Sequence, residues 1–294
     1  MITKYLADMM TKPGQSPVFE SPEQYGLAYQ DVTFEAEDGV TLSGWLIEGS
    51  SDKVIIQSHF GVQCSRSGFT PEGKGFIKLY KQNISFLRQA KYLVDQGYTV
   101  LMYDLRNHGN SDLGTIPSVA WGCEEAKDVV AAVDFISTHP KYQNSQIGLL
   151  SICMGTSSTA FAYGLDNGLK NYENIKALIS VQPLRYLDYM SAMGVPNFLT
   201  HRVNQYNINR GGADLSGSFF PFVTKIKVPT LVIQNKNDPW TKLDNVDEYF
   251  HLLSCEKELL MLDLEKNRAA AYDWLGEHPE QWCDFFDKHL TSIT

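Results

Sequence analysis

The sequence has no apolar run long enough to cross a bilayer, no excess of positive charge and little cysteine. Polar residues interrupt its first ten positions, which lack the continuous apolar stretch and cleavage site of a signal peptide. A net charge of −9 argues against nucleic acid or an anionic membrane surface as the main partner. These absences predict a cytoplasmic protein that binds neither nucleic acid nor membrane.

The cysteines do not form a recognisable framework. There are five, they are widely scattered, and no two form a C-x-x-C pair; they are Cys64, Cys123, Cys153, Cys255 and Cys283. This spacing suggests neither a disulfide scaffold nor a zinc site, so we expect reduced thiols, no metal and no cofactor. The chain length of 294 residues fits one large α/β domain with one or two inserted segments.

Strand-like and helix-like segments alternate along most of the chain. Asp38-Gly39 separates two runs of alternating apolar and polar residues, a pattern that predicts an antiparallel hairpin. Buried strands are expected at 54–58, 98–103, 146–150, 175–181, 229–234 and 258–262. Helices are expected at 87–96, 121–138, 154–163 and 279–290. This alternation predicts a doubly wound α/β fold with a mainly parallel sheet, whose ligands bind beyond the carboxyl ends of the strands.

The segment 183–227 interrupts this alternation with aromatic and methionine side chains set among glycine and proline. A lid over an apolar cleft is our preferred interpretation, although ordinary packing against the core fits the composition equally well. We therefore divide the chain into an N-terminal extension lying on the core, a first core part, a lid insertion and a second core part, at 1–30, 31–182, 183–227 and 228–294.

The segment around Cys153 has the pattern of a sharp turn between a strand and a helix. Ser151 and Gly155 flank Cys153 in the positions of the small residues of G-x-S-x-G, which let the backbone bend and expose a nucleophile. A thiol is chemically competent here, and the following helix directs free N–H groups toward it. The alternative interpretation is a small buried cysteine without a chemical role.

Further segments accompany this turn: the Asp38-Gly39 hairpin, the loop His59-Phe60-Gly61, the loop 104–111, and a strand at 229–233 that leads to Asp238. Together they resemble the α/β-hydrolase superfamily from about residue 31 to residue 290. The resemblance is closest to small bacterial hydrolases of the dienelactone-hydrolase and peptidase-like type, some of which use cysteine as the nucleophile. It implies an α/β-hydrolase fold with an N-terminal antiparallel hairpin and a lid insertion.

The resemblance also assigns roles to individual residues. It implies that Cys153 is the nucleophile and that Asp238 is the acid of a catalytic triad. The backbone N–H of Met154 is expected to form half of an oxyanion hole. The N–H of Phe60 is expected to form the other half, with Gly61 as the alternative donor.

Asn267 stands where the family has its histidine base. Asparagine does not titrate, so it cannot take the thiol proton or pass it to a leaving group. Three explanations follow: a Cys-His-Asp enzyme that has lost its base, a site turned to acyl transfer, cyclisation or isomerisation, or a pocket that only binds a ligand. We expect an enzyme that processes an ester, lactone or thioester through an acyl-Cys153 intermediate. The alternative is a non-catalytic small-molecule binding protein.

Candidate substrate contacts come from the loop after the predicted strand at 54–58 and from the lid. They are His59, Gly61, Met190, Met193 and Phe198. For His59, a structural hydrogen bond to its loop is the competing role. The expected ligand is a small apolar acyl compound, and whether the chain forms a homodimer stays open.

Overall fold

The structure is a computed structural model that describes residues 1–12, 15–61, 63–75 and 79–291. Within these residues, the central sheet has eight strands in the order β1-β2-β6-β3-β7-β8-β9-β10. Their bounds are Tyr29–Glu35 (β1), Thr41–Ile47 (β2), Lys53–Ser58 (β3), Thr99–Tyr103 (β6), Gln146–Ile152 (β7), Ile175–Val181 (β8), Thr230–Asn235 (β9) and Lys257–Leu262 (β10). A separate small pair joins β4 (Gly68–Phe69) to β5 (Ile84–Ser85).

The strand directions confirm the predicted fold class. The pairs β1/β2 and β2/β6 are antiparallel, and every further pair from β6 to β10 is parallel. The hairpin between β1 and β2 turns at Gly39, whose φ of 81° suits glycine, and the N–H of Ala36 donates to the carbonyl of Val40. The carboxyl ends of β3, β7, β8 and β9 therefore meet at one edge of the sheet.

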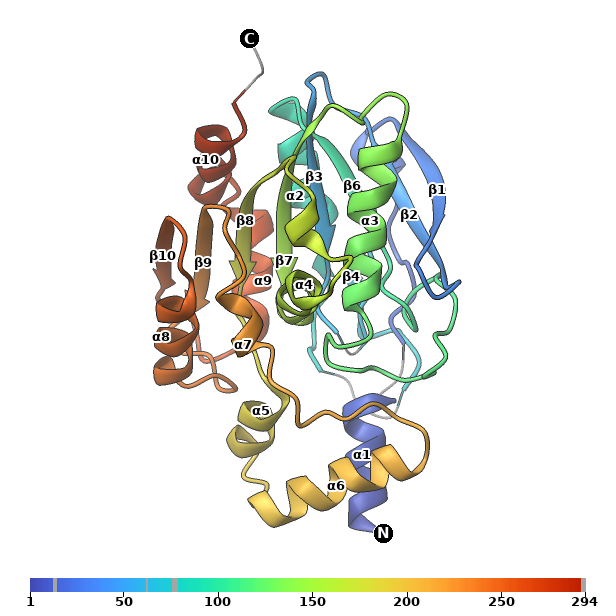
Figure 1. Cartoon of the computed structure of the whole chain (residues 1–294), viewed down its shortest axis with the longest axis vertical. Helices are drawn as coiled ribbons and strands as arrows, with labels where there is room; N and C mark the ends of the chain where they lie inside the picture. Colours follow the sequence, from blue (N-terminus) through green and yellow to red (C-terminus); the bar gives the residue numbers. More distant parts are fainter. Residues whose placement is uncertain (13–14, 62, 76–78, 292–294) are drawn as a thin grey trace.

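Helices cover both faces of the sheet (Figure 1). On one face lie α2 (Leu87–Asp95), α9 (Arg268–Glu277) and α10 (Glu280–His289). On the other lie α3 (Ala126–Thr138), α4 (Met154–Gly164), α7 (Phe220–Val223) and α8 (Leu243–Leu252). Short 3₁₀ helices form at Pro22–Tyr25 and Leu169–Asn171. In the described ranges, no helix is both long enough and apolar enough to span a membrane.

Three further helices form what we call the cap: α1 (Ile2–Thr11), α5 (Tyr186–Ala192) and α6 (Asn197–Asn209). They pack around their own apolar cluster and lie below the sheet in Figure 1. Arg210 binds α1 by an ion pair with Asp8 and by a hydrogen bond to the Thr11 hydroxyl at 2.7 Å. Within the N-terminal segment 1–30, α1 packs against α6 of the cap, whereas Val18, Tyr25 and Leu27 pack against the core.

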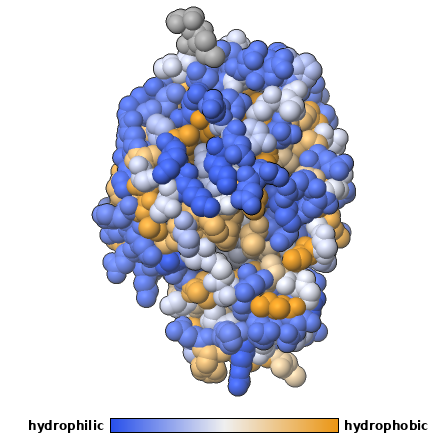
Figure 2. All heavy atoms as spheres, in the orientation of Figure 1, coloured by the Kyte–Doolittle hydropathy of each residue, from blue (hydrophilic) through white to orange (hydrophobic). Residues whose placement is uncertain are grey.

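The predicted lid segment contributes to two regions. Its first part forms α5 and α6 of the cap, whereas α7 near its end packs against α4 and α8 in the core. Figure 2 shows polar side chains over most of one face, with apolar side chains near the junction of cap and sheet and at the free end of the cap. Exposed apolar side chains of the cap include Ile2, Tyr5, Leu187, Met193 and Phe198.

Candidate active site

Cys153 occupies a strained turn between β7 and α4. Its φ of 53° and ψ of −103° lie outside the regions that a non-glycine residue ordinarily adopts. The N–H of Cys153 donates to the Val181 carbonyl at 2.8 Å, which ties the turn to the next strand. A Cβ on Gly155 would lie 2.4 Å from the Ser58 carbonyl oxygen, so glycine permits the close approach of α4 to β3. The predicted strand, turn and helix are all present.

Cys153 lines an apolar cavity of about 280 Å³ between the sheet edge and the cap. This is near the lower end of the range for small-molecule sites. Four other residues singled out from the sequence, Phe60, Gly61, Met154 and Met193, also line it. The remaining lining residues are Met9, Met10, Leu79, Tyr80, Val119, Trp121, Leu184, Tyr189, Trp240 and Tyr272. The sequence reasoning missed α1 as a wall of this cavity.

The other three candidate contacts lie elsewhere. His59 is buried, and its Nε2 accepts a hydrogen bond from the Leu105 N–H at 3.0 Å, so its Nδ1–H donates to the Phe60 carbonyl at 2.6 Å. Burial lowers the pKa of His59 to about 4, which keeps the ring neutral. Met190 is fully buried in the cap and Phe198 is 66% exposed. None of the three lines the cavity.

Asp238 follows β9 and forms a buried ion pair with Arg268. The second carboxylate oxygen accepts the N–H of Trp240 at 3.0 Å. Arg268 also donates to the Thr241 hydroxyl at 3.1 Å and to the carbonyl of Gln182, and Gln182 returns a hydrogen bond from its side-chain amide to the Arg268 carbonyl. The guanidinium of Arg268 thus pairs with the carboxylate that the resemblance assigned as the acid of the triad.

Asn267 begins α9 and serves as its N-cap. Its Oδ1 accepts the N–H of Ala269 at 3.0 Å, and its Nδ2 donates to the Glu265 carboxylate at 3.2 Å. Asparagine is a favoured N-cap residue, because its side-chain oxygen satisfies a free N–H of the first turn. Within the described residues, the hydrogen bonds of the Asn267 side chain therefore go to its own helix and loop, and the neighbouring Arg268 reaches Asp238.

Tyr272 connects Arg268 to the cysteine. The Nε–H of Arg268 donates to the Tyr272 oxygen at 2.7 Å, and Tyr272 lines the same cavity as Cys153, whose thiol interacts with it electrostatically. Since this oxygen accepts from Arg268, its own proton is available to the sulfur. Burial raises the pKa of Tyr272 well above its usual value, so the phenol stays protonated. The ring stacks on Phe60 at 4.7 Å between centroids.

The sequence alone did not single out this connection. Its one local signal is that Tyr272 lies four residues after Arg268, hence one turn further along the same helix face. Nothing in the spacing indicates that this face meets Cys153, because the contact joins α9 to a turn more than a hundred positions earlier.

Comparisons with known proteins agree on the fold. No family model matches the chain. The chain is 27% identical over 158 residues to a polyketide transferase from a Penicillium species, covering 54% of this chain and 46% of that protein. It is 27% identical over 160 residues to a polyketide transferase from Aspergillus fumigatus, covering 54% and 47%. The matched region spans about half the length of these relatives.

Solved structures match more of the chain. An esterase from Pyrococcus furiosus has a TM-score of 0.70 at 23% identity, covering 96% of this chain and 99% of that one. An α/β hydrolase from Penicillium has a TM-score of 0.64 at 19% identity, covering 90% and 99%. The chain has the α/β-hydrolase fold.

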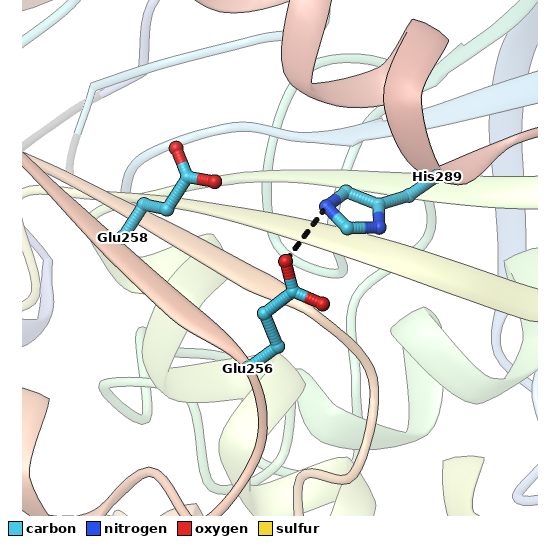
Figure 3. A group of neighbouring side chains, drawn as sticks. All are labelled: Glu256, Glu258 and His289. Carbon is cyan, nitrogen blue, oxygen red and sulfur yellow. Dashed lines mark ion pairs between the residues drawn. The ribbon is translucent and has the colours of Figure 1, made fainter.

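Elsewhere on this α/β-hydrolase fold, one group of side chains in the described ranges is close enough to hold a metal ion. Glu256, Glu258 and His289 come together beside β10 and α10 (Figure 3). Lys288 donates to both carboxylates, at 2.8 and 2.9 Å, so a cation of the chain itself already offsets part of their charge. The group is also separate from the cavity that holds Cys153. We assign it no metal.

Proposed function

We propose that the chain is an enzyme that transfers an acyl group through a covalent intermediate on Cys153. The observation that carries this proposal is a strained backbone turn that presents a thiol to an apolar cavity. Strain of this kind persists where the surrounding structure holds it and clusters at functional sites. Relatives named as polyketide transferases, and a structural neighbour named as an esterase, support acyl chemistry on this fold.

In the first step, the Cys153 sulfur attacks the carbonyl carbon of an acyl thioester or ester. The sulfur–carbon bond forms, the bond to the leaving thiol or alcohol breaks, and the thiol proton goes to the leaving group. Developing negative charge on the carbonyl oxygen is stabilised by the backbone N–H groups of Met154 and Phe60, with Gly61 as the alternative to Phe60. Each such donor contributes roughly 3 kcal/mol of transition-state stabilisation.

Tyr272 takes the position beside the thiol that a base would occupy. Its hydroxyl proton passes to the leaving atom while its oxygen receives the thiol proton, so the relay leaves Tyr272 unchanged. Arg268 holds the phenol oxygen, and Asp238 holds Arg268. In this proposal Asp238 and Arg268 are positioning residues and Tyr272 is the catalytic one.

The cavity favours transfer over hydrolysis. Among its described lining residues there is no histidine, lysine, aspartate or glutamate that would activate water. An acceptor that is a stronger nucleophile than water needs less help to attack the acyl-cysteine. Its attack forms the new bond to the acyl carbon, releases the Cys153 sulfur, and returns a proton to that sulfur through Tyr272.

Intact-mass spectrometry tests the proposal after incubation with the N-acetylcysteamine thioester of octanoic acid. We expect the wild type to gain the mass of one octanoyl group, mapped to Cys153, and Cys153→Ala to gain none. Tyr272→Phe removes one hydroxyl and should slow acylation by about ten- to hundredfold, since proton transfer by a positioned group typically contributes at least that much.

Cys123→Ala is the matched control, because it removes an exposed thiol that lies outside the cavity. It should acylate like the wild type. If Cys153 takes up no acyl group from octanoyl, acetyl or benzoyl thioesters, the enzyme proposal is wrong and the non-catalytic binding protein becomes the better interpretation.

A further inference from the structure

The two edges of the central sheet carry different side chains. β10 forms one edge (Figure 1), where Leu259 is 36% exposed and Met261 is 38% exposed. The charged residues of β10 are confined to its first two positions, 257–258. β1 forms the other edge, and its exposed residues are all polar: Gln30, Asp31, Thr33 and Glu35. Charged and polar side chains protect an edge strand against further pairing, so most of β10 lacks the protection that β1 has.

The backbone of β10 presents hydrogen-bonding groups on its outer side. The carbonyls of Glu256, just before the strand, and of Leu262, its last residue, each accept an N–H from the β9 side at 2.9 Å. Backbone direction alternates along a strand, so the even-numbered residues point to β9 and the odd-numbered ones point away from it. In the part of the chain that the structure describes, β9 is the only strand beside β10. The N–H and C=O groups of Leu259 and Met261 therefore have no strand to pair with.

Both faces of this edge present apolar surface. Lys257 donates to the Phe250 carbonyl of α8 at 2.8 Å, which places the odd-numbered side chains of β10 on the α8 side. The exposed leucine and methionine lie on that side. On the α10 side, a groove of about 280 Å³ runs beside the strand, and its apolar lining includes Leu260, Trp282 and Phe285.

We propose that β10 pairs with β10 of a second copy of this chain, antiparallel and around a two-fold axis at Leu260. In this register Leu259 lies opposite Met261 of the second copy, and Lys257 lies opposite its Asp263. Leu259 and Met261 both direct their backbone groups outward, so each such pair exchanges two hydrogen bonds. A two-fold contact repeats every pairing, which gives two apolar pairs and two pairs of opposite charge.

The neighbouring registers match less well. An axis at Leu259 would set Lys257 opposite Met261, and an axis at Glu258 would set two carboxylates opposite each other. With the axis at Leu260, the two Leu260 side chains meet beside the groove, so the pairing covers apolar surface on both faces of the sheet. The strand is therefore complementary to itself in one register, which identifies a second copy as the partner. This inference is independent of the chemistry proposed at Cys153.

Size-exclusion chromatography with light scattering tests the dimer at several protein concentrations. We expect the wild type to have twice the chain mass of 33.1 kDa. Met261→Lys should have the mass of one chain, because an ammonium group on an edge strand opposes pairing. Leu259→Lys is a second variant on the same edge, and both substitutions replace exposed side chains. Thr33→Lys is the matched control on β1 and should stay a dimer.

A cysteine at the axis tests the register. Residues opposite each other in a non-hydrogen-bonded antiparallel pair have Cα atoms about 4.5 Å apart, within the range for a disulfide. In a Cys123→Ala background, which lacks the exposed cysteine, Leu260→Cys should cross-link two chains under mild oxidation, and Thr33→Cys should not. A wild type that is monomeric at every concentration, a dimer that both lysine variants leave intact, or a Leu260→Cys protein that does not cross-link would overturn the inference.

Discussion

The molecule contains two buried arginine clusters that are alike in chemistry and different in surroundings. The Arg106 cluster joins Arg106 to Asp128 and Asp38 at 2.8 and 2.7 Å. The Arg268 cluster joins Arg268 to Asp238 and to the hydroxyl of Tyr272. Both arginines are 1% exposed, and both clusters lie beyond the carboxyl ends of strands.

The two clusters differ in the groups at which their hydrogen-bond networks end. In the Arg106 cluster the guanidinium lies between carboxylates of the hairpin and α3, and the neighbouring Arg66–Asp104 pair closes the same region at 2.6 Å. None of these residues lines the cavity. In the Arg268 cluster the network ends at a phenol that faces a thiol and an open cavity. A buried ion pair therefore does not indicate function by itself. Its role depends on whether the network also holds a group that lines the cavity.

The largest expected effect comes from breaking the Arg106 cluster. Arg106→Met leaves Asp128 buried without its partner, which should lower the free energy of unfolding by about 3–5 kcal/mol. The acylation rate of Cys153 per folded molecule should stay within twofold of the wild type, because this cluster does not touch the cavity. Urea denaturation gives the stability, and acylation measured well below the denaturation midpoint gives the rate.

The counterpart experiment makes the same arginine-to-methionine substitution in the Arg268 cluster. Arg268→Met should cost a similar amount of stability, yet it should also slow acylation of Cys153 about ten- to hundredfold, because Tyr272 loses the donor that orients it. If Arg106→Met and Arg268→Met slow acylation equally after correction for the folded fraction, the distinction between the two clusters fails. Arg106→Lys and Arg268→Lys repeat the test should the methionine variants not fold.

Local patterns predicted most of the sheet. The strand expected at 175–181 is β8, the hairpin at Asp38-Gly39 joins β1 to β2, and the turn at Cys153 has the positive φ that a G-x-S-x-G pattern implies. These features depend on residues within a few positions of each other, such as alternating burial or a small residue beside a sharp turn. The sequence carries that information directly.

The site was less predictable because its contacts join distant segments. Tyr272 on α9 meets Cys153, and Met10 on α1 meets the same cavity, although neither pairing has a periodic signal. Arg268 was overlooked for another reason. The family resemblance marks Asn267, one position earlier, as the place of the missing base. An asparagine at that position does not indicate that the neighbouring Arg268 forms an ion pair with Asp238.

The next largest effect concerns histidines beside the Arg106 cluster. Burial lowers the pKa of His59 to about 4 and of His108 to about 3, while an unfolded histidine titrates near 6.5. Between those values the unfolded chain binds more protons, so stability rises with pH and falls on acidification below about 6.5. We expect the wild type to lose about 1–2 kcal/mol for each histidine between pH 7 and pH 5.

Urea denaturation at several pH values measures this slope. His108→Gln should remove about half of the histidine contribution to this slope, because one of the two buried imidazoles is removed; Asp128, whose pKa burial raises to about 7, contributes with the opposite sign in both proteins. His201→Gln changes an exposed histidine and should leave the slope as it is. An unchanged slope in His108→Gln would show that acid sensitivity arises elsewhere and that this cluster is not the pH-dependent region of the fold.

The smallest expected effect is at the position that the resemblance marked for a base. Asn267→His should change hydrolysis of p-nitrophenyl acetate less than about threefold, because Asp238 is held by Arg268 and cannot orient an imidazole. The substitution also removes the N-cap of α9, which should lower stability by about 1 kcal/mol. Ester hydrolysis and urea denaturation of the same protein sample measure both consequences.

The double variant Asn267→His/Arg268→Ala tests whether the Arg268–Asp238 ion pair is what keeps a histidine at position 267 inactive. Removing the guanidinium frees Asp238, so an imidazole at position 267 gains the carboxylate that would orient it toward Cys153, and hydrolysis should rise above that of either single variant. A hundredfold increase in Asn267→His alone would contradict our account. It would mean that the side chain at 267 reaches the thiol while Arg268 stays in place, and that the Arg268 cluster is a structural ion pair like the Arg106 cluster rather than part of the active site.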